Sequence, residues 1–191
     1  MSVLTIASSP SANSRSARLL GRAREALTAG GVASEHLELR GLPAEALLHA
    51  NTRDPLIAAA VAAVAEADAI IIATPVYKAA YSGLLKVFLD LLPQDAFTGK
   101  LVLPIASGGS LAHTLAIDYT LRPVLASLNA HNVLPGIFAV DKDIEIQADG
   151  TLALAPALLK RLGERLADLR AQLPHAAELS QFSRRPQAEA A

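Results

Sequence analysis

The fold is decided by the stretch Ala69-Ile70-Ile71-Ile72-Ala73-Thr74-Pro75-Val76-Tyr77-Lys78-Ala79-Ala80-Tyr81-Ser82-Gly83. Its first five residues are apolar, rich in β-branching and too few for a helix, which indicates a strand covered on both faces. Pro75 is expected to end this strand, because proline lacks a backbone donor, and Ser82 is expected to cap a helix over residues 83–92. Residues 76–81 are then exposed at the carboxyl edge of a strand. In open α/β sheets, ligands bind at that edge.

Four more apolar segments of strand length surround this one, with helical patterns between them. Strands joined by helices of this length imply βαβ units and parallel pairing, because a tight turn cannot join parallel neighbours. The sequence therefore predicts an α/β fold, a three-layer doubly wound sandwich around a five-stranded parallel sheet with the flavodoxin-like order 2-1-3-4-5. The expected strands are residues 3–7, 33–39, 69–74, 101–107 and 133–139, and the expected helices are 14–28, 55–66, 82–92, 110–130 and 155–173.

The chain is interpreted as one domain, because no break in composition divides it internally. Residues 1–173 are expected to form this domain. The polar segment 141–153 contains the turn signal Asp149-Gly150 and is consistent with either a short hairpin or a loop. Residues 174–191 contain Pro, Gln, Ser and Arg with little periodicity, which predicts a mobile C-terminal tail.

Composition excludes several classes of function. The formal net charge is −1 and the basic residues are scattered, which disfavours nucleic-acid binding. The absence of cysteine excludes disulfides, thiol catalysis and thiolate metal sites, and the histidines show no ligand spacing. We expect a cytoplasmic protein without a membrane span, because the N-terminus does not read as a signal and no apolar run approaches about 18 residues. A hydrophobic content of 52% suggests more than one subunit.

The loop after the first expected strand, Ser8–Ser16, combines serine hydroxyls, the cation Arg15 and a helix N-terminus. Free N–H groups and the positive end of the helix dipole favour an anion there. The loop lacks both the Gly-Lys-Ser/Thr and the G-x-G-x-x-G patterns, so a monophosphate fits better than a triphosphate. An ordinary serine-rich turn with a good N-cap is the alternative.

Another loop, Ser107–His113, also joins an expected strand to an expected helix. Gly108 and Gly109 let the backbone approach a ligand closely, and Ser107 and Ser110 can donate hydrogen bonds or cap the helix. A plain turn is the alternative here too. Because three such loops meet at one edge of the predicted sheet, we interpret them as one ligand site. The backbone of residues 75–78 could supply the donors and the flat surface that an isoalloxazine ring needs, and hydride transfer would then require no catalytic triad.

The expected helix over residues 110–130 contains a conflict at Pro123. Proline cannot donate to the carbonyl of Tyr119, so the helix is expected to kink or widen there, and a π-bulge is a common solution. Tyr119 would be displayed by this defect toward a partner subunit or toward the ligand. A plain proline kink with a surface tyrosine is the alternative.

Together these motifs resemble the NADPH-dependent FMN reductase family, and within it the FMN reductases of alkanesulfonate utilisation. The resemblance covers about residues 1–140. It is carried by Ala7-Ser8-Ser9-Pro10 with Ser14-Arg15-Ser16, the block 73–83 quoted above, Leu89-Asp90-Leu91-Leu92-Pro93, Gly108-Gly109-Ser110-Leu111-Ala112-His113, Asp118-Tyr119 and Arg122-Pro123-Val124-Leu125.

The resemblance implies that FMN and NADPH bind, that FMN is reduced, and that the reduced flavin is passed to a flavin-dependent alkanesulfonate monooxygenase. It also implies a homo-oligomer, tetramer or dimer, with Tyr119 in a π-helix at the interface. Residues implied to hold the flavin phosphate are Ser9, Ser14, Arg15 and Ser16, and those implied to line the ring are Pro75, Val76, Tyr77, Lys78, Ser107, Gly108, Gly109 and Ser110. No catalytic side chain is implied. Ser8 and Ser11 depart from the glycine and the arginine that relatives carry, which leaves Arg15 as the main positive group.

Other functions remain as alternatives. An enzyme with tightly held FMN could reduce quinones or azo dyes, and a flavodoxin-like electron carrier is disfavoured by the small net charge. A hydrolase built on Gly109-Ser110 is disfavoured because the G-x-S-x-G pattern is broken at Ala112. Asp141, Asp143 and Glu145 lack the pattern of a calcium loop and are interpreted as a solvated edge.

Overall fold

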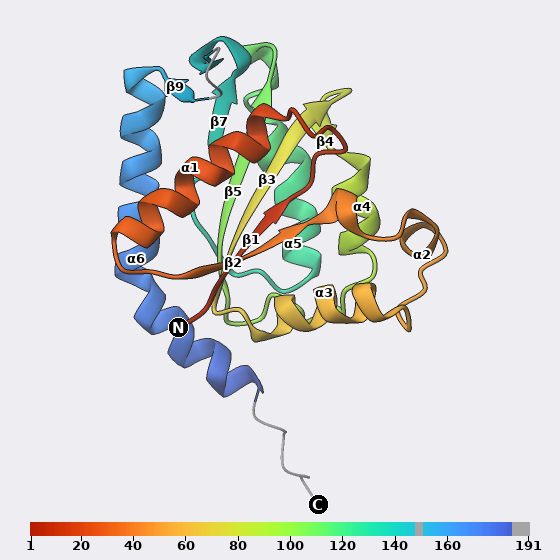
Figure 1. The fold of residues 1–191 in the computed structure, drawn as a ribbon. Helices are drawn as coiled ribbons and strands as arrows, with labels where there is room; N and C mark the ends of the chain where they lie inside the picture. Colours follow the sequence, from red (N-terminus) through yellow and green to blue (C-terminus); the bar gives the residue numbers. More distant parts are fainter. Residues whose placement is uncertain (148–150, 185–191) are drawn as a thin grey trace, which may run out of the picture.

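A computed structural model describes residues 1–147 and 151–184 of the protein (Figure 1). The main sheet is mostly parallel and has the strand order β2-β1-β3-β5-β6, with β7 also paired to β5. A short strand, β4 (Ala80–Tyr81), pairs antiparallel with β3. In the numbering of the predicted strands this order is 2-1-3-4-5, which confirms the flavodoxin-like prediction. The strands of this sheet are β1 (Val3–Ala7), β2 (Ser34–Glu38), β3 (Ala69–Tyr77), β5 (Leu101–Gly108), β6 (Asn132–Val133) and β7 (Ile137–Val140).

The predicted strand 133–139 is divided into β6 and β7. Pro135 lies in the gap between them, where the ladder to β5 is interrupted, because proline has no N–H to donate. A Cβ on Gly136 would approach Cδ1 of Ile117 to 2.8 Å, so a larger residue here would require the Ile117 side chain to shift. Both pieces pair with β5, so together they fill the fifth position of the sheet.

Helices cover both faces of the sheet, which confirms the three-layer sandwich (Figure 1). In β3, Ile71 and Ala73 pack against α1 and α6, while Ile70 and Ile72 pack against α3, α4 and α5. Both faces of β3 are therefore buried, as its apolar sequence predicted. The helices are α1 (Arg15–Ala29), α2 (Ala44–Leu48), α3 (Pro55–Glu66), α4 (Gly83–Leu89), α5 (Arg122–Ser127) and α6 (Pro156–Arg184), with 3₁₀ turns η1 (Leu39–Gly41), η2 (Leu111–His113) and η4 (Asp141–Asp143) and the π-helix η3 (Ile117–Leu121).

Side-chain caps set the starts of three helices. Ser14 accepts from the N–H of Ala17 at α1, and Ser82 accepts from the N–H of Leu85 at 3.2 Å to start α4. Asp54 accepts from two N–H groups at α3, whose first residue is Pro55. Helix α4 ends at Leu89, three residues before the predicted end, and residues 90–92 continue only as turns.

Helix α6 extends beyond the predicted end at residue 173 to Arg184 and includes Pro174. The prediction was wrong because apolar residues continue at helical spacing on one face, where Leu169, Leu173 and Ala176 are all buried. The Ser180 hydroxyl donates to Oδ1 of Asp68 at 2.5 Å and ties this part of the helix to the start of β3. Of the predicted tail 174–191, residues 185–191 lie outside the described residues.

Two further elements form a small antiparallel hairpin, β8 (Ile144–Ile146) and β9 (Leu152–Leu154). This decides between the two alternatives left open for the segment 141–153. The expected turn at Asp149-Gly150 lies outside the described residues. The hairpin packs beside α1 and α6, because Ile144 belongs to the same hydrophobic cluster as their buried leucines.

Candidate functional site

The prediction that Pro75 ends strand β3 was wrong. The strand continues to Tyr77 and turns back into β4 (Ala80–Tyr81). Proline fits here because of the direction that its nitrogen faces. The carbonyl of Ala73 accepts from the N–H of Ser8 at 2.9 Å, so Ala73 faces β1. Alternate residues of a strand face the same side, so the nitrogen of Pro75 points past Ala7, the last residue of β1, where no ladder bond is needed.

The turn between β3 and β4 consists of Lys78 and Ala79, whose φ angles are 49° and 65°. Positive φ at both central residues is the pattern of a type I′ turn, which normally carries glycine or asparagine. Each non-glycine residue in this conformation costs about 1–3 kcal/mol. The hairpin therefore holds local strain at its tip, at the carboxyl edge of the sheet (Figure 1).

The three predicted loops converge on one open cleft of about 170 Å³. Nine of the twelve predicted site residues line it, together with three that were not predicted. The predicted lining residues are Ser9, Ser14, Arg15, Pro75, Val76, Tyr77, Ser107, Gly108 and Gly109, and the additional ones are Ser11, Asn13 and Asp141.

Three predicted residues do not line the cleft. Ser16 is fully buried, with its hydroxyl 2.8 Å from that of Ser14. Lys78 lies exposed at the tip of the hairpin. Ser110 caps η2 by accepting from the N–H of Ala112 at 3.2 Å. These positions follow from local hydrogen bonding and turn geometry, which loop membership alone does not predict.

The first loop is held by hydrogen bonds of its own. The Ser9 hydroxyl accepts from the N–H of Ser11 at 3.1 Å, and the Ser11 hydroxyl accepts from the N–H of Asn13 at 3.3 Å. Ser8 is buried and donates from its hydroxyl to the carbonyl of Ala73 at 2.9 Å. Its side chain thus binds the neighbouring strand rather than the cleft.

Asp141 was not predicted as a site residue, and its interpretation as a solvated edge is corrected by the structure. It is the first residue of η4, directly after β7, and its Oδ2 lies 3.6 Å from Nη1 of Arg15. The rule that placed the other loops at the carboxyl edge applies to this position as well, because Asp141 follows a strand of the same sheet. The sequence thus indicated the edge of the sheet for Asp141, whereas its approach to Arg15 depends on the tertiary structure.

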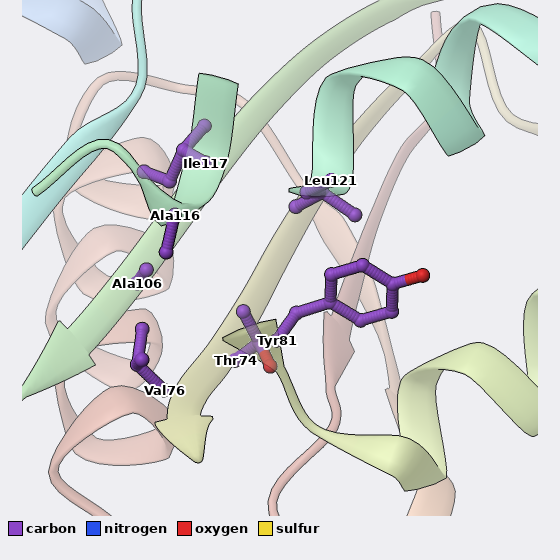
Figure 2. Close-up of a pocket in the computed structure, with 7 residues that line it drawn as sticks. All are labelled: Thr74, Val76, Tyr81, Ala106, Ala116, Ile117 and Leu121. Carbon is purple, nitrogen blue, oxygen red and sulfur yellow. The ribbon is translucent and has the colours of Figure 1, made fainter. Parts of the chain in front are cut away.

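Behind the cleft, the hairpin packs against the π-helix (Figure 2). Figure 2 shows Tyr81 beside Leu121, with its hydroxyl pointing away from the other six residues. Burial raises the pKa of Tyr81, and the positive charge of Lys86 opposes this. The gap is too narrow for a water molecule. Val76 lines both this gap and the cleft. The packing of η3 across the gap therefore affects the wall of the cleft that Val76 forms. The lining residues are Thr74, Val76, Tyr81, Ala106, Ala116, Ile117 and Leu121.

The π-bulge expected at Pro123 is confirmed by η3. The N–H of Arg122 donates to the carbonyl of Ile117, five residues earlier, which widens the helix by one residue. Pro123 then lies in the first turn of α5, where a missing N–H is not needed. The single helix predicted over residues 110–130 is replaced by η2, η3 and α5. Tyr119 is 74% exposed on η3.

The cleft offers hydrogen-bonding groups, backbone and the ion pair of Arg15 with Asp141. Serine hydroxyls, Asn13 and the peptide groups of Pro75, Val76 and the glycine pair can hold a polar, flat molecule in place. Within residues 1–147 and 151–184, no group of histidine and acidic side chains could hold a metal ion. In the same residues, no helix is long and apolar enough to cross a membrane.

Residues 1–145 match the family model described as NADPH-dependent FMN reductase. The chain belongs to this family. It is also 50% identical to an "FMN reductase (NADPH)" of Pseudomonas putida strain KT2440, over 88% of this chain and 84% of the relative. An "FMN reductase (NADPH)" of Escherichia coli K12 is 49% identical over 75% of each chain. These matches confirm the predicted class, an oxidoreductase of the FMN reductase family, whose cofactors are FMN and NADPH.

A solved structure supports the same family assignment. An NADH:FMN oxidoreductase, EMOB, in its apo form superposes with a TM-score of 0.81 and 39% identity, over 90% of this chain and 89% of the other. The names of these similar proteins thus give NADPH as the reductant in one case and NADH in the other.

Proposed function

We propose that this protein catalyses the NAD(P)H-dependent reduction of FMN as a substrate and releases the reduced flavin. The observation that carries the proposal is the convergence of three strand-end loops on one cleft in a chain of the FMN reductase family. Such a cleft at the carboxyl edge of a parallel sheet is the usual flavin position in flavodoxin-like folds.

The first loop suits the flavin phosphate. Ser9, Ser14 and Arg15 line the cleft next to the start of α1, where N–H groups and the helix dipole favour an anion. The buried Ser16 supports this loop through its hydrogen-bonding contact with Ser14. Among the described residues that line the cleft, Arg15 is the one with a positively charged side chain.

The hairpin and the end of β5 suit the flat ring. A Cβ added to Gly108 would lie 3.3 Å from the ring of Phe138 and 3.4 Å from Cβ of Val76. Glycine therefore lets the end of β5 lie close to these two side chains. A Cβ on Gly109 would meet nothing within 4 Å, so its backbone is open. FMN supplies the hydride-accepting chemistry when bound, while the peptide groups of Pro75, Val76 and Tyr77 orient its ring. Lys78 and Ser110 flank this surface on the hairpin tip and on η2.

The proposal extends to a two-component system. By its likeness to the reductases of alkanesulfonate utilisation, the protein would supply reduced FMN to a flavin-dependent alkanesulfonate monooxygenase in the cytoplasm. Release of the flavin is supported by an open cleft in which the cation Arg15 is paired with the carboxylate of Asp141.

A homo-oligomer, tetramer or dimer, is part of the same proposal. Tyr77, Leu111, Leu115 and Tyr119 are large hydrophobic residues that are exposed on the hairpin and around η3. Apolar side chains gathered in this way are typical of an interface. A second subunit would cover them and meet Tyr119 on the π-helix. Sedimentation of the purified protein measures the subunit number, and a monomer at micromolar concentration would contradict this part.

The activity itself is tested with protein passed through a desalting column. Oxidation of NADPH should be negligible without flavin and should start when FMN is added, with saturation at increasing FMN. NADH measured in parallel gives the nucleotide preference. Protein that stays yellow after desalting and passes electrons to quinones without added FMN would instead support an enzyme with tightly held flavin. No NADPH oxidation with added FMN would refute the proposal.

A further inference from the structure

Arg15 and Asp141 are the charged residues among those described as lining the cleft. Nη1 of Arg15 lies 3.6 Å from Oδ2 of Asp141, and the two side chains are 45% and 40% exposed. They are far apart in the sequence, with Arg15 in the first turn of α1 and Asp141 in the turn after β7. The formal charge of the cleft lining is therefore zero.

We propose that Asp141 weakens FMN binding by occupying Arg15, the guanidinium that the flavin phosphate needs. This inference rests on the proposed function. A phosphate that reaches Arg15 must displace a carboxylate already paired with it, and its negative charges are repelled by that carboxylate. Asp141 is thus a specificity-determining residue that keeps the phosphate from being held tightly, which suits an enzyme that releases its flavin.

The geometry favours competition over support. A distance of 3.6 Å is longer than a charge-assisted hydrogen bond of about 2.7–2.9 Å, so Asp141 does not clamp the guanidinium in one orientation. Both side chains are partly exposed, so the pair itself is weak and can open. Arginine can donate in several directions, but the carboxylate neutralises the charge that would attract an anion.

The experiment compares two flavins that differ only in the phosphate. Dissociation constants of FMN and riboflavin are measured by quenching of flavin fluorescence at one fixed ionic strength. Asp141→Asn removes the charge and keeps the shape, and it should lower the dissociation constant of FMN by about 5-fold while leaving that of riboflavin unchanged. Asp141→Glu restores the charge and should behave like the wild type.

Asp143→Asn is the matched control. Asp143 belongs to the same turn and carries the same charge but does not line the cleft, so its replacement should leave both dissociation constants unchanged. In an Arg15→Gln background, Asp141→Asn should improve FMN binding by clearly less than about 5-fold, because the competition for the guanidinium is gone and only the repulsion between carboxylate and phosphate is relieved.

Three outcomes would overturn the inference. Weaker FMN binding by Asp141→Asn would mean that Asp141 orients Arg15 for the phosphate. Equal changes for FMN and riboflavin would indicate a structural effect that does not involve the phosphate. An unaltered affinity of Asp141→Asn for FMN would show that the ion pair does not compete. By contrast, wild-type protein that binds neither flavin would refute the proposed function itself.

Discussion

The hydroxyl of Ser82 donates a hydrogen bond of 2.6 Å to the backbone carbonyl of Ser8. Residues 74 positions apart in the sequence are joined by this bond, one at the start of the first loop and the other at the start of α4. The same hydroxyl accepts from the N–H of Leu85, and the N–H of Ser82 donates to Oγ1 of Thr74 at 2.9 Å. Ser82 therefore fixes the first loop, the hairpin and the helix cap relative to one another.

Replacement of Ser82 by alanine should lower the free energy of unfolding by about 2–4 kcal/mol. The substitution removes a helix cap and leaves the buried carbonyl of Ser8 without this donor. Urea unfolding followed by circular dichroism measures the loss. Ser127→Ala is the control, because Ser127 is exposed and donates only to Val124 on its own helix. Equal stability of the two variants would contradict the role assigned to Ser82.

Arg15→Gln should weaken FMN binding by about 10-fold and leave riboflavin binding unchanged. A hydrogen bond from a charged guanidinium to a phosphate contributes about 1.5–3 kcal/mol, and the pairing with Asp141 reduces this contribution. The loss should shrink at high ionic strength, because salt screens the exposed charge. Arg22→Gln is the control on the same helix, where Arg22 pairs with Glu25. A similar loss for riboflavin would show that Arg15 acts on the fold rather than on the phosphate.

Ser180→Ala should destabilise the protein by about 1–3 kcal/mol, because the carboxylate of Asp68 is buried and loses a charge-assisted bond. Thermal and urea unfolding both report this change. Glu178→Ala on the same helix should have little effect, since its contact with His175 is exposed and 3.9 Å long. Wild-type stability of the Ser180 variant would mean that the bond between Ser180 and Asp68 does not stabilise the fold.

Acidification should reduce stability through His36. Burial and the positive charge of Arg24 lower the pKa of His36 below 6.5, more than Glu38 and the bond to Thr5 raise it. The unfolded chain then binds more protons than the folded one as the pH falls through 6.5, so the contribution of His36 is present above that pH and lost below it. Because His36 is partly exposed, the effect should be modest.

The measurement for His36 is urea unfolding at several pH values on either side of 6.5. His36→Gln should show a flatter dependence of the free energy of unfolding on pH than the wild type. His49→Gln is the control for a general effect of removing a histidine and should retain the wild-type slope. A His36 variant with an unchanged slope would assign the pH dependence to other groups.

Local sequence determined much of this protein. The apolar run 69–73 specified a strand buried on both faces, Ser14 and Ser82 specified helix starts, and Pro123 specified a break that the structure forms as a π-helix. These features depend on neighbours along the chain, such as a missing N–H or a hydroxyl within reach of the first turn. The alternation of strands and helices then restricted the sheet to a parallel order with its loops at one edge.

Only the tertiary structure decided what depends on residues far apart in the sequence. Pro75 remains inside β3 because β1 ends at Ala7, and this relationship between strands cannot be read from either one. The end of helix α6 is held against the sheet by the hydroxyl of Ser180, which donates to Asp68 just before β3. Asp141 lines the cleft because β7 pairs with β5 and thereby carries it to Arg15. Each of these features depends on a long-range contact, because burial and pairing act on residues that the chain brings together only by folding.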